Sequence, residues 1–388
     1  MKELSTTQFY ATFVIPFLDA ALRFYDLFEV DAHDCESFCD VWVNREKGVF
    51  SKDQILSILG NAFFCSFAVR EEVYEDDLPS IGYDEIHTGD ARVLVTKLRL
   101  LFDYVTETVC PTAANTPERM EVYRCELASL PPPHDSNDTV QPPVMHQLGE
   151  SIDDQQSMIR LDFANAWIGG GALADGCVQE EITFAQCCGL NTLRWNQRPL
   201  KEEESVVVKG YAQYGVVEKG TYGFNISYGG CIAGGKIMGG ALAVVDAADF
   251  RFHPASDQYS TAFIRRELQK LLSALLHPSV KDITSVAGGN WGCGIFGGDY
   301  ELKFLIQWLA CCISKKQLHY FPFDNECFEE FNSTLCALVE SGCTVKELEE
   351  FLLVSEIPET RSVWDSFVTF FAEARQAKQL DAEDDESD

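Results

Sequence analysis

A chain of 388 residues with 46% hydrophobic content is long enough to bury one large core or the cores of two domains. Its 61 acidic and 30 basic residues give a formal charge of −31, which argues against attachment to nucleic acid or anionic lipid by bulk electrostatic attraction. We therefore expect no direct binding to duplex nucleic acid, and any polyanionic ligand would need local contacts. The 15 cysteines are dispersed through apolar segments, which predicts reduced, buried thiols rather than a disulfide scaffold.

Metal binding and membrane insertion are both disfavoured by the sequence. His33, Cys35 and Cys39 lie close together, but no pair of spaced CxxC units accompanies them, so we expect no structural zinc and no other metal. The apolar segment 9–27 contains Asp19, and its uncharged part is too short to span a bilayer. It predicts an amphipathic helix of a soluble protein.

The first hundred or so residues contain few glycines and place apolar residues at helical spacing. The segments 54–67 and 91–109 give the clearest pattern, and either Ser51 or Asp53 could cap the first of them. In the second segment, a stripe typical of core packing is formed by Leu94, Leu98, Leu101 and Val105. This part of the chain is therefore predicted to be all helical.

The composition of the sequence changes between Pro111 and Pro143. Proline, serine and aspartate are common there, and apolar residues show no sustained periodicity, which predicts a connector. Beyond it, short β-rich runs alternate with helical stretches, a pattern typical of an α/β fold with a parallel or mixed sheet. The expected strands are 158–163, 205–208, 241–245 and 318–323, and the expected helices are 260–276, 302–313, 345–354 and 363–374. Asp381–Asp388 lacks apolar partners, so we expect it to be disordered.

Two glycine-rich segments fall where such folds place ligand-binding loops, at the carboxyl ends of strands. Gly169–Gly171 closely precedes Gln179–Glu181, so exposed backbone lies beside paired carboxylates suited to proton transfer. Asn290–Asp299 contains four glycines and has the composition of a phosphate-binding loop. Together the segments predict cleavage of a nucleotide-like substrate.

The first segment differs from two common nucleotide-binding motifs. It lacks a Gly-Lys-Ser/Thr ending and G-x-G-x-x-G spacing, which excludes the P-loop and the dinucleotide-binding motif. A strand-to-helix turn with solvated glutamates fits the spacing alone. Asp162 and Asn165, at the end of a β-rich run, weaken that interpretation because they would bring further polar groups to the same place.

These residues resemble the signature of the poly(ADP-ribose) glycohydrolases. The matching segments are 161–165, 168–171, 178–182 and 290–299, with further similarity at 61–65, 245–247, 265–268 and 320–323. They cover most of the chain in the order found in the family. The resemblance implies an α/β fold, namely a macrodomain-like three-layer α/β/α sandwich with a mixed sheet, preceded by an N-terminal helical accessory domain.

With the changes of texture, the resemblance divides the chain into a helical accessory domain (1–115), a proline-containing connector (116–150), a catalytic domain with C-terminal helices (151–375) and a disordered acidic tail (376–388). It implies hydrolysis of ribose–ribose O-glycosidic bonds in poly(ADP-ribose) on modified proteins, with release of ADP-ribose and without a cofactor. It also implies a monomer of the nucleus or cytoplasm, with no membrane partner, in the DNA damage response. Two alternatives stay open: a module that binds ADP-ribose without turnover, and a hydrolase of mono-ADP-ribosylated protein.

The resemblance also implies roles for the acidic residues. Glu181 is the expected general acid and base, and we expect partial burial and the carboxylates Glu180 and Asp162 to favour its protonated form. Glu180 and Asn165 match positions that hold ribose hydroxyls, and Asp162 and Gln179 match positions that shape the site. Adjacent residues point in different directions on a regular helix or strand, so we expect the two glutamates on an irregular loop.

The diphosphate is expected on N–H groups of the triple glycine and of residues 292–296. Phe323 matches the family's adenine-side phenylalanine and Phe296 its phosphate-loop phenylalanine, although either could be ordinary core. Tyr214, or alternatively Tyr211, matches the tyrosine that clamps the substrate. With the adenine-edge match at 152–153, the expected substrate-binding residues are Ile152, Asp153, Asn165, Gly169, Gly170, Gly171, Gln179, Tyr214, Asn290, Trp291, Gly292, Cys293, Gly294, Ile295, Phe296 and Phe323.

Overall fold

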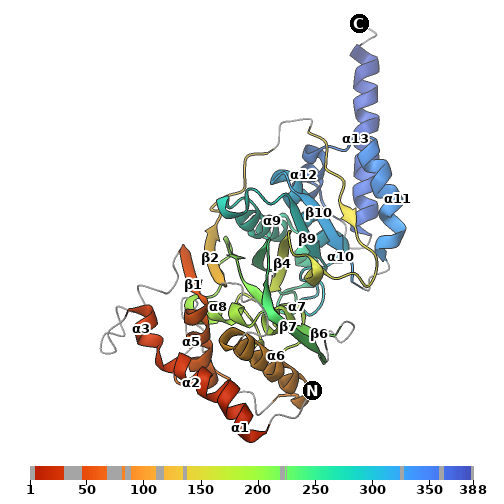
Figure 1. The fold of residues 1–388 in the computed structure, drawn as a ribbon. Helices are drawn as coiled ribbons and strands as arrows, with labels where there is room; N and C mark the ends of the chain where they lie inside the picture. The colour runs from red at the N-terminus through yellow and green to blue at the C-terminus, as the bar shows by residue number, and fades with distance from the viewer. Residues whose placement is uncertain are drawn as a thin grey trace. The chain divides into compact units, whose positions relative to one another are not determined.

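The computed structural model describes residues 5–29, 46–67, 81–83, 89–110, 118–133, 138–218, 223, 225–323, 327–357 and 362–385. The chain forms two compact units that are not continuous in sequence (Figure 1). The first consists of Met1–Cys125, Asp162–Lys201 and Ser205–Val245, and the second of Glu126–Leu161, Glu202–Glu204 and Asp246–Asp388. The group of His33, Cys35 and Cys39 lies outside the described residues.

The first unit begins with helices, as the sequence predicts. They are α1 (Thr6–Phe9), α2 (Ile15–Leu22), α3 (Phe24–Phe28), α5 (Lys52–Phe63) and α6 (Ala91–Val109). Ser51 caps α5, because its Oγ accepts the N–H of Gln54 at 3.3 Å while Gln54 Oε1 accepts the N–H of Ser51 at 2.9 Å. Of the two predicted caps, Ser51 is therefore the one used. Phe17, Ile58 and Tyr104 are fully buried in the core that these helices share.

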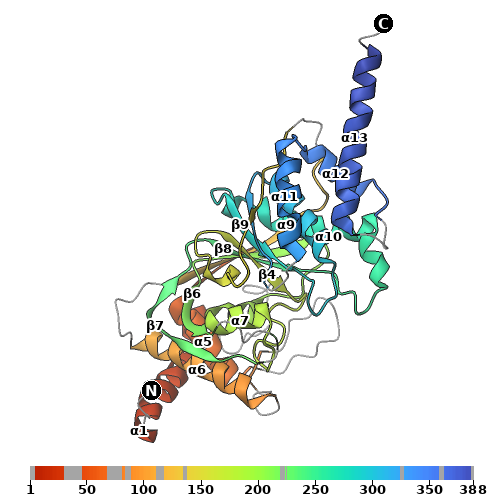
Figure 2. The same cartoon turned by 90° about the vertical axis from the view of Figure 1, so that its right-hand side faces the viewer.

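The strands of the first unit run in the order β1-β2-β5-β8. Their bounds are β1 (Lys47–Ser51), β2 (Arg119–Glu126), β5 (Glu204–Lys209) and β8 (Ala241–Asp246), of which β2, β5 and β8 enter the second unit by one residue each. β1 pairs antiparallel with β2, and β5 pairs antiparallel with β8. A separate antiparallel hairpin, β6 (Ala212–Val217) and β7 (Tyr228–Ile237), packs against α6 and α7 (Gln179–Gln186), as Figure 2 shows. The short α8 (Thr192–Asn196) follows α7.

Strands of the second unit are parallel and run in the order β4-β9-β10-β3. They are β3 (Val144–Met145), β4 (Ile159–Ala164), β9 (Ser285–Gly289) and β10 (Gln317–Phe321). The last three residues of β4 belong to the first unit. α10 (Tyr300–Ile313) packs on β9 and β10, and both α9 (Thr261–Leu275) and α12 (Val345–Leu353) pack on α10 (Figure 1). α11 (Cys327–Glu340) and α13 (Val363–Asp385) complete the chain.

Each strand and helix expected after the connector is present. Most ends are shifted by a few residues, but α13 continues to Asp385, well beyond the predicted end at residue 374. The strands β1 and β2 were not predicted. β1 has only five residues, and β2 lies inside the proline-containing range, although its buried Met120 and Val122 do alternate with more exposed neighbours. The predicted domain boundaries stay a prediction. So does the disorder of the acidic tail, although α13 is described as far as Asp385.

Two further findings concern cysteines and membranes. The described cysteines are free thiols, and most are buried, but the exposed ones are Cys65, Cys110, Cys231 and Cys336. Within the described ranges, no helix combines the length and the apolar character needed to cross a bilayer.

Candidate active site

Helix α7 opens with the two glutamates that the sequence singles out. Glu180 and Glu181 occupy its first turn, and their side chains are buried, with 2% and 8% of their surface exposed. The expectation that the pair lies on an irregular loop is therefore wrong. The first N–H groups of a helix have no partner within it, so carboxylates in the first turn can approach the preceding chain and still belong to a regular helix.

Glu180 binds the chain just after β4. Its Oε2 accepts the N–H of Asn165 at 3.0 Å, and its Oε1 accepts the N–H of Gly169 at 2.6 Å. Burial, and then the charges of Asp162 and Glu181, raise the pKa of Glu180 well above its usual range despite these bonds. Asp162 has no exposed surface. Burial and the neighbouring carboxylates therefore favour the protonated form of Glu180.

Glu181 binds the other end of the segment 169–178, which precedes α7 and is called the glycine loop below. Its Oε1 accepts the N–H of Gly171 at 3.1 Å, and its Oε2 accepts the N–H of Val178 at 3.1 Å. Gly170 has a φ of +43°, and a Cβ atom there would lie 2.7 Å from Glu181 Oε1. A Cβ on Gly176 would lie 2.8 Å from Glu181 Cγ. Only glycine lets the backbone come this close to the carboxylate.

Two cations that sequence reasoning missed hold the outer side of this loop. Arg194 of α8 donates to the carbonyl oxygen of Gly170 at 2.7 Å. Lys97 of α6 donates to three more carbonyl oxygens, at 2.9 Å on Gly171, 3.0 Å on Ala172 and 2.6 Å on Ala174. Burial lowers the pKa of Lys97 to about 8, although the charge of Glu181 opposes the shift. The glycine loop is thus fixed by carboxylates on one side and by cations on the other.

A signal for Lys97 was present in the sequence. It lies between Val93 and Leu100 on the buried face of α6, so a charged residue interrupts an apolar stripe. A buried lysine needs acceptors, which makes such a residue a candidate for an internal contact. The apolar stripe predicted from the sequence did not include Lys97. One residue of that stripe, Leu98, is only half-buried.

The two remaining polar residues of the motif, Gln179 and Asn165, bind backbone N–H groups at and just after the end of β4. Gln179 Oε1 accepts the N–H of Phe163 at 2.8 Å, which agrees with a supporting role. Asn165 Oδ1 accepts the N–H of Trp167 at 2.9 Å, and its side chain is half-buried. A contact between Asn165 and a ribose stays a prediction.

The triple glycine was expected to donate to the diphosphate. Its three N–H groups instead have partners within the first unit, since Gly169 donates to Glu180, Gly171 donates to Glu181, and Gly170 donates to the carbonyl oxygen of Trp167 at 3.0 Å. In this structure the triple glycine positions the carboxylates.

Both candidate clamping tyrosines lie in the core of the first unit. Tyr211 and Tyr214 each expose 1% of their surface, and Tyr214 packs edge-on against Tyr104 with ring centroids 4.9 Å apart. Burial raises the pKa of Tyr214 to about 12. A Cβ on Gly235 would come within 2.5 Å of the Tyr214 ring. Because neither ring reaches solvent, the arrangement differs from that of an open clamp, and a clamping role stays a prediction.

Glu118, beside these tyrosines, predicts a pH dependence of stability. It accepts the N–H of Ala212 at 3.2 Å and the hydroxyl of Tyr104 at 3.3 Å, and burial raises its pKa from 4.5 to about 7. Below pH 4.5 it is protonated in both the folded and the unfolded chain. Between pH 4.5 and 7 only the unfolded chain loses the proton, so the free energy of unfolding falls as the pH rises, by about 3 kcal/mol in total.

Glu118→Gln is expected to remove this part of the pH dependence. Urea unfolding of the unmodified chain and of the variant, compared at either end of that pH window, measures it. Glu126→Gln, at the exposed end of β2, the strand that begins directly after Glu118, is the control and should keep the slope of the unmodified chain. An unchanged slope in Glu118→Gln would contradict the assignment.

In the second unit, the predicted phosphate loop connects β9 to α10. Asn290 is fixed at its start, because its Nδ2 donates to the carbonyl oxygen of Pro322 at 2.8 Å and its Oδ1 accepts the hydroxyl of Tyr320 at 3.0 Å. Asp299 at its end caps α10, where its Oδ1 accepts the N–H of Leu302 at 2.9 Å. Both ends of the loop are therefore rigidly attached to regular structure.

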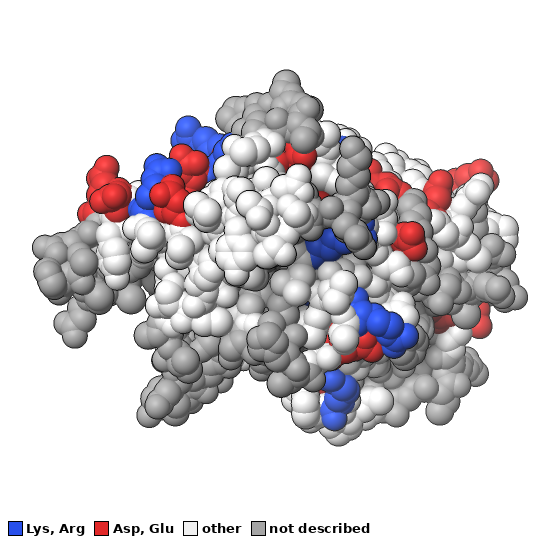
Figure 3. Space-filling model, turned by 60° about the horizontal axis from the view of Figure 1, so that its bottom comes forward, with Lys and Arg blue, Asp and Glu red and all other residues white. Residues whose placement is uncertain are grey.

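Backbone donors between these ends are available. The N–H groups of Gly294, Ile295 and Phe296 have no acceptor among the described residues, and Gly294 and Ile295 are exposed. Such a row of N–H groups can bind an anion without any charged side chain. On the face drawn in Figure 3, basic side chains lie among acidic ones and form no continuous basic patch among the described residues. Backbone N–H groups, which carry no charge, therefore suit the binding of an anionic ligand to this acidic protein.

A buried group of charges lies under the loop. Lys303 is 1% exposed, its ammonium lies 4.3 Å from the ring centroid of Trp291, and it pairs with Glu267. Glu267 also pairs with Arg266 at 2.8 Å and accepts the N–H of Ala248 at 2.8 Å. Burial lowers the pKa of Lys303 well below its usual range. Paired charges of this kind fix the geometry of the loop above them. Cys293, also expected to bind substrate, is buried, and burial raises its pKa.

The predicted adenine contacts also lie in the second unit. Phe323 follows β10 with a φ of +62° and exposes 47% of its surface, and a stacking role for its ring stays a prediction. Ile152 is buried at the start of a 3-10 helix. Asp153 contacts Arg160, which donates to the carbonyl oxygen of Asp153 at 3.0 Å and lies 3.6 Å from its carboxylate.

The predicted residues thus form two groups, each described within its own unit. The catalytic group of the first unit contains Asp162, Asn165, Gly169, Gly170, Gly171, Gln179, Glu180, Glu181 and Tyr214. The binding group of the second unit contains Ile152, Asp153, Asn290, Trp291, Gly292, Cys293, Gly294, Ile295, Phe296 and Phe323.

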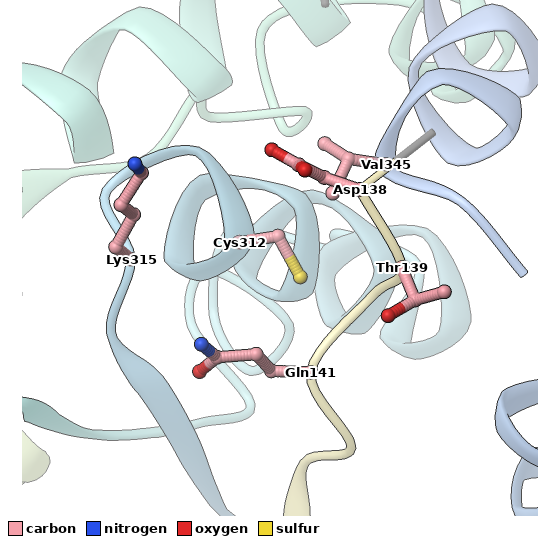
Figure 4. A pocket seen from close by; sticks show the side chains of 6 residues that line it. All are labelled: Asp138, Thr139, Gln141, Cys312, Lys315 and Val345. Atoms are coloured by element: carbon pink, nitrogen blue, oxygen red, sulfur yellow. The ribbon is translucent and has the colours of Figure 1, made fainter. Parts of the chain in front are cut away.

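The last features considered for the site are a cavity and the side chains that could bind a metal ion. A hollow of about 240 Å³ in the second unit lies between the end of α10, the start of α12 and the segment 138–141 (Figure 4). Its lining is Asp138, Thr139, Gln141, Cys312, Lys315 and Val345, none of them a predicted site residue. Among the residues that the structure describes, no group of three His, Cys, Asp or Glu side chains is arranged to hold a metal ion.

Comparisons with known proteins place this geometry in a family. The family model described as poly(ADP-ribose) glycohydrolase, macro domain fold, matches residues 132–330, and the model of the helical domain of the same family matches residues 1–124. Poly(ADP-ribose) glycohydrolase 2 of Caenorhabditis elegans is 26% identical over 331 residues, which cover 80% of this chain and 65% of that protein. The probable poly(ADP-ribose) glycohydrolase 2 of Arabidopsis thaliana is 24% identical over 384 residues, covering 84% and 73%.

Solved structures give a weaker similarity. The crystal structure of poly(ADP-ribose) glycohydrolase from Thermomonospora curvata is 15% identical and covers 57% of this chain and 85% of that chain, with a TM-score of 0.35. The two family models together account for most of the chain, and they confirm both the resemblance and the fold class predicted from the sequence. The chain therefore belongs to the poly(ADP-ribose) glycohydrolase family, with the family's helical domain followed by its macro domain.

Proposed function

We propose that the chain hydrolyses ribose–ribose O-glycosidic bonds in poly(ADP-ribose) and releases ADP-ribose, with Glu181 as general acid and base. The observation that carries the proposal is the pair Glu180 and Glu181, buried in the first turn of α7 and bound by four backbone N–H groups. Such fixed carboxylates suit a glycosidase, because the reaction needs a proton donor and an acceptor of fixed position.

The chemistry follows from the states of these carboxyls. Protonated Glu181 donates its proton to the departing ribose oxygen as the glycosidic bond breaks, and positive charge develops on the other ribose. Water then attacks the anomeric carbon of that ribose, and ionised Glu181 accepts a proton from the water. The raised pKa of Glu180 favours the protonated form of that carboxyl, which limits the negative charge beside the proposed donor Glu181.

The binding group would hold the rest of the terminal ADP-ribose unit. N–H groups of Gly294, Ile295 and Phe296 would donate to the diphosphate, and Phe323 would stack on the adenine. Asn165 and Glu180 would hold ribose hydroxyls. The natural substrate in this proposal is polymer attached to modified proteins, degraded by a monomer in the nucleus or cytoplasm.

Incubation of the purified full chain with poly(ADP-ribose), followed by chromatography of the products, tests the proposal. Release of ADP-ribose is the expected result. Intact polymer that co-migrates with the protein would instead identify a binding module without turnover. Cleavage of a mono-ADP-ribosylated protein in a parallel incubation, with the polymer left intact, would identify the third class of activity.

A further inference from the structure

The segment 249–253 lies directly beside the predicted phosphate loop. The N–H of Phe250 donates to the carbonyl oxygen of Phe296 at 2.9 Å, which joins the two segments. The guanidinium of Arg251 lies 5.2 Å from the ring centroid of Phe296 and 5.4 Å from that of Phe252. Phe252 exposes 80% of its surface. An aromatic ring and a guanidinium thus face solvent next to the exposed backbone N–H groups.

Arg251 is held in place by the carboxylate of Asp249. Its Nε donates to Asp249 Oδ1 at 2.9 Å and its Nη2 donates to Asp249 Oδ2 at 2.5 Å. Its Nη1 has no acceptor among the described residues, and 48% of the side chain is exposed. The pairing therefore fixes the direction of the guanidinium and leaves one edge of it able to donate to an anion.

A single exposed phenylalanine is common and means little by itself. Here it is combined with a fixed arginine and with a row of backbone donors, which is the combination that binds single-stranded nucleotide chains by stacking and by phosphate contacts. The terminal ADP-ribose unit has one adenine, and Phe323 is its proposed partner. Phe252 is therefore a second stacking surface for which that unit has no base.

We propose that Arg251 and Phe252 form a binding subsite for a neighbouring ADP-ribose unit of the same polymer, in which the adenine stacks on Phe252 and a diphosphate oxygen accepts from Arg251 Nη1. This inference rests on the proposed function, since only a polymeric substrate provides a second unit. The subsite contributes affinity for the chain of units and takes no part in breaking the bond.

The test compares ligands of one unit and of several units. Phe252→Ala and Arg251→Ala are made separately in the full chain carrying Glu181→Gln, and binding of ADP-ribose and of purified poly(ADP-ribose) oligomers is measured by calorimetry. Each substitution is expected to weaken oligomer binding about tenfold and to leave the affinity for ADP-ribose unchanged. Phe252→Trp should keep oligomer binding, because it preserves the stacking surface.

Arg92→Ala is the matched control, because Arg92 pairs with Asp90 two residues earlier in the same way, with 3.0 Å between Nη2 and Oδ2. It lies in the first unit and should change neither affinity. Oligomer affinity unchanged in Phe252→Ala and Arg251→Ala would overturn the subsite while the proposed function stands. An equal loss of affinity for ADP-ribose and for the oligomer would also overturn the subsite. Failure of the Glu181→Gln chain itself to bind either ligand would overturn both.

Discussion

Glu181→Gln is expected to lower the rate of ADP-ribose release from poly(ADP-ribose) by about two to four orders of magnitude, which is the usual contribution of a general acid or base. An amide has the size of the carboxyl but can neither donate a proton to the departing ribose oxygen nor accept one from water. Binding of ADP-ribose should stay within a few-fold of the unmodified chain, because the predicted diphosphate and adenine contacts lie on other residues. Initial rates and calorimetric titration with ADP-ribose measure the two quantities.

Glu180→Gln is the comparison that assigns the two carboxyls. Because Glu180 is proposed to hold ribose hydroxyls, its replacement should raise KM and lower kcat less than Glu181→Gln does. Full turnover by Glu181→Gln would remove the proposed role of that residue. A larger loss of kcat in Glu180→Gln would exchange the two roles.

Lys97→Met is expected to produce the second large effect, a loss of kcat by at least tenfold together with a loss of about 2–4 kcal/mol in the free energy of unfolding. Methionine keeps the apolar stem but removes the lysine donor from the carbonyl oxygens of Ala172 and Ala174, and each unsatisfied buried group costs about 1–3 kcal/mol. The carbonyl oxygen of Gly171 still accepts the N–H groups of Ala174 and Gly176. Relief of the desolvation of the ammonium offsets part of this cost. Because the glycine loop holds Glu181 through Gly171, kcat should fall more than the affinity for ADP-ribose.

Lys316→Met controls for the loss of stability. Lys316 is also buried and donates to two carbonyl oxygens, at 2.8 Å on Val280 and 2.5 Å on Ile283, but it lies in the second unit and contacts no proposed site residue. Urea unfolding should show both variants to be destabilised, whereas only Lys97→Met should lose turnover. If the two variants keep the same kcat, Lys97 does not position the glycine loop.

The sequence predicted the residues of the motif and the elements β4, β5, β8, β10, α9, α10, α12 and α13, because both are local patterns. It predicted none of the strands β1, β2, β3, β6, β7 and β9. The helical position of Glu180 and Glu181 was missed, although acidic residues are common in the first turn of a helix. Lys97 was missed for a different reason. Its charge on an apolar face was visible, but its acceptors begin 74 residues later in the chain, and sequence spacing does not reveal such a contact.

Tyr214 illustrates the limit of a motif match. The segment that contains it was matched to the family's clamping tyrosine, yet the residue lies on β6, where the side chain points into the core beside Tyr104 and Gly235. A match of residue types carries no information on which face of a strand is buried. That face is set by packing against α6, which no local pattern in the segment encodes.

The contact between Lys97 and the glycine loop restricts how this protein can be divided, by experiment or by evolution. Lys97 lies in the segment that matches the helical family model, whereas Gly171, Ala172 and Ala174 lie in the segment that matches the macro domain model. A fragment cut at the boundary between the two models would lose the hydrogen bonds that Lys97 donates to the glycine loop. We therefore expect a gene fusion or truncation that separates the two segments to disturb the glycine loop, even where each segment stays folded.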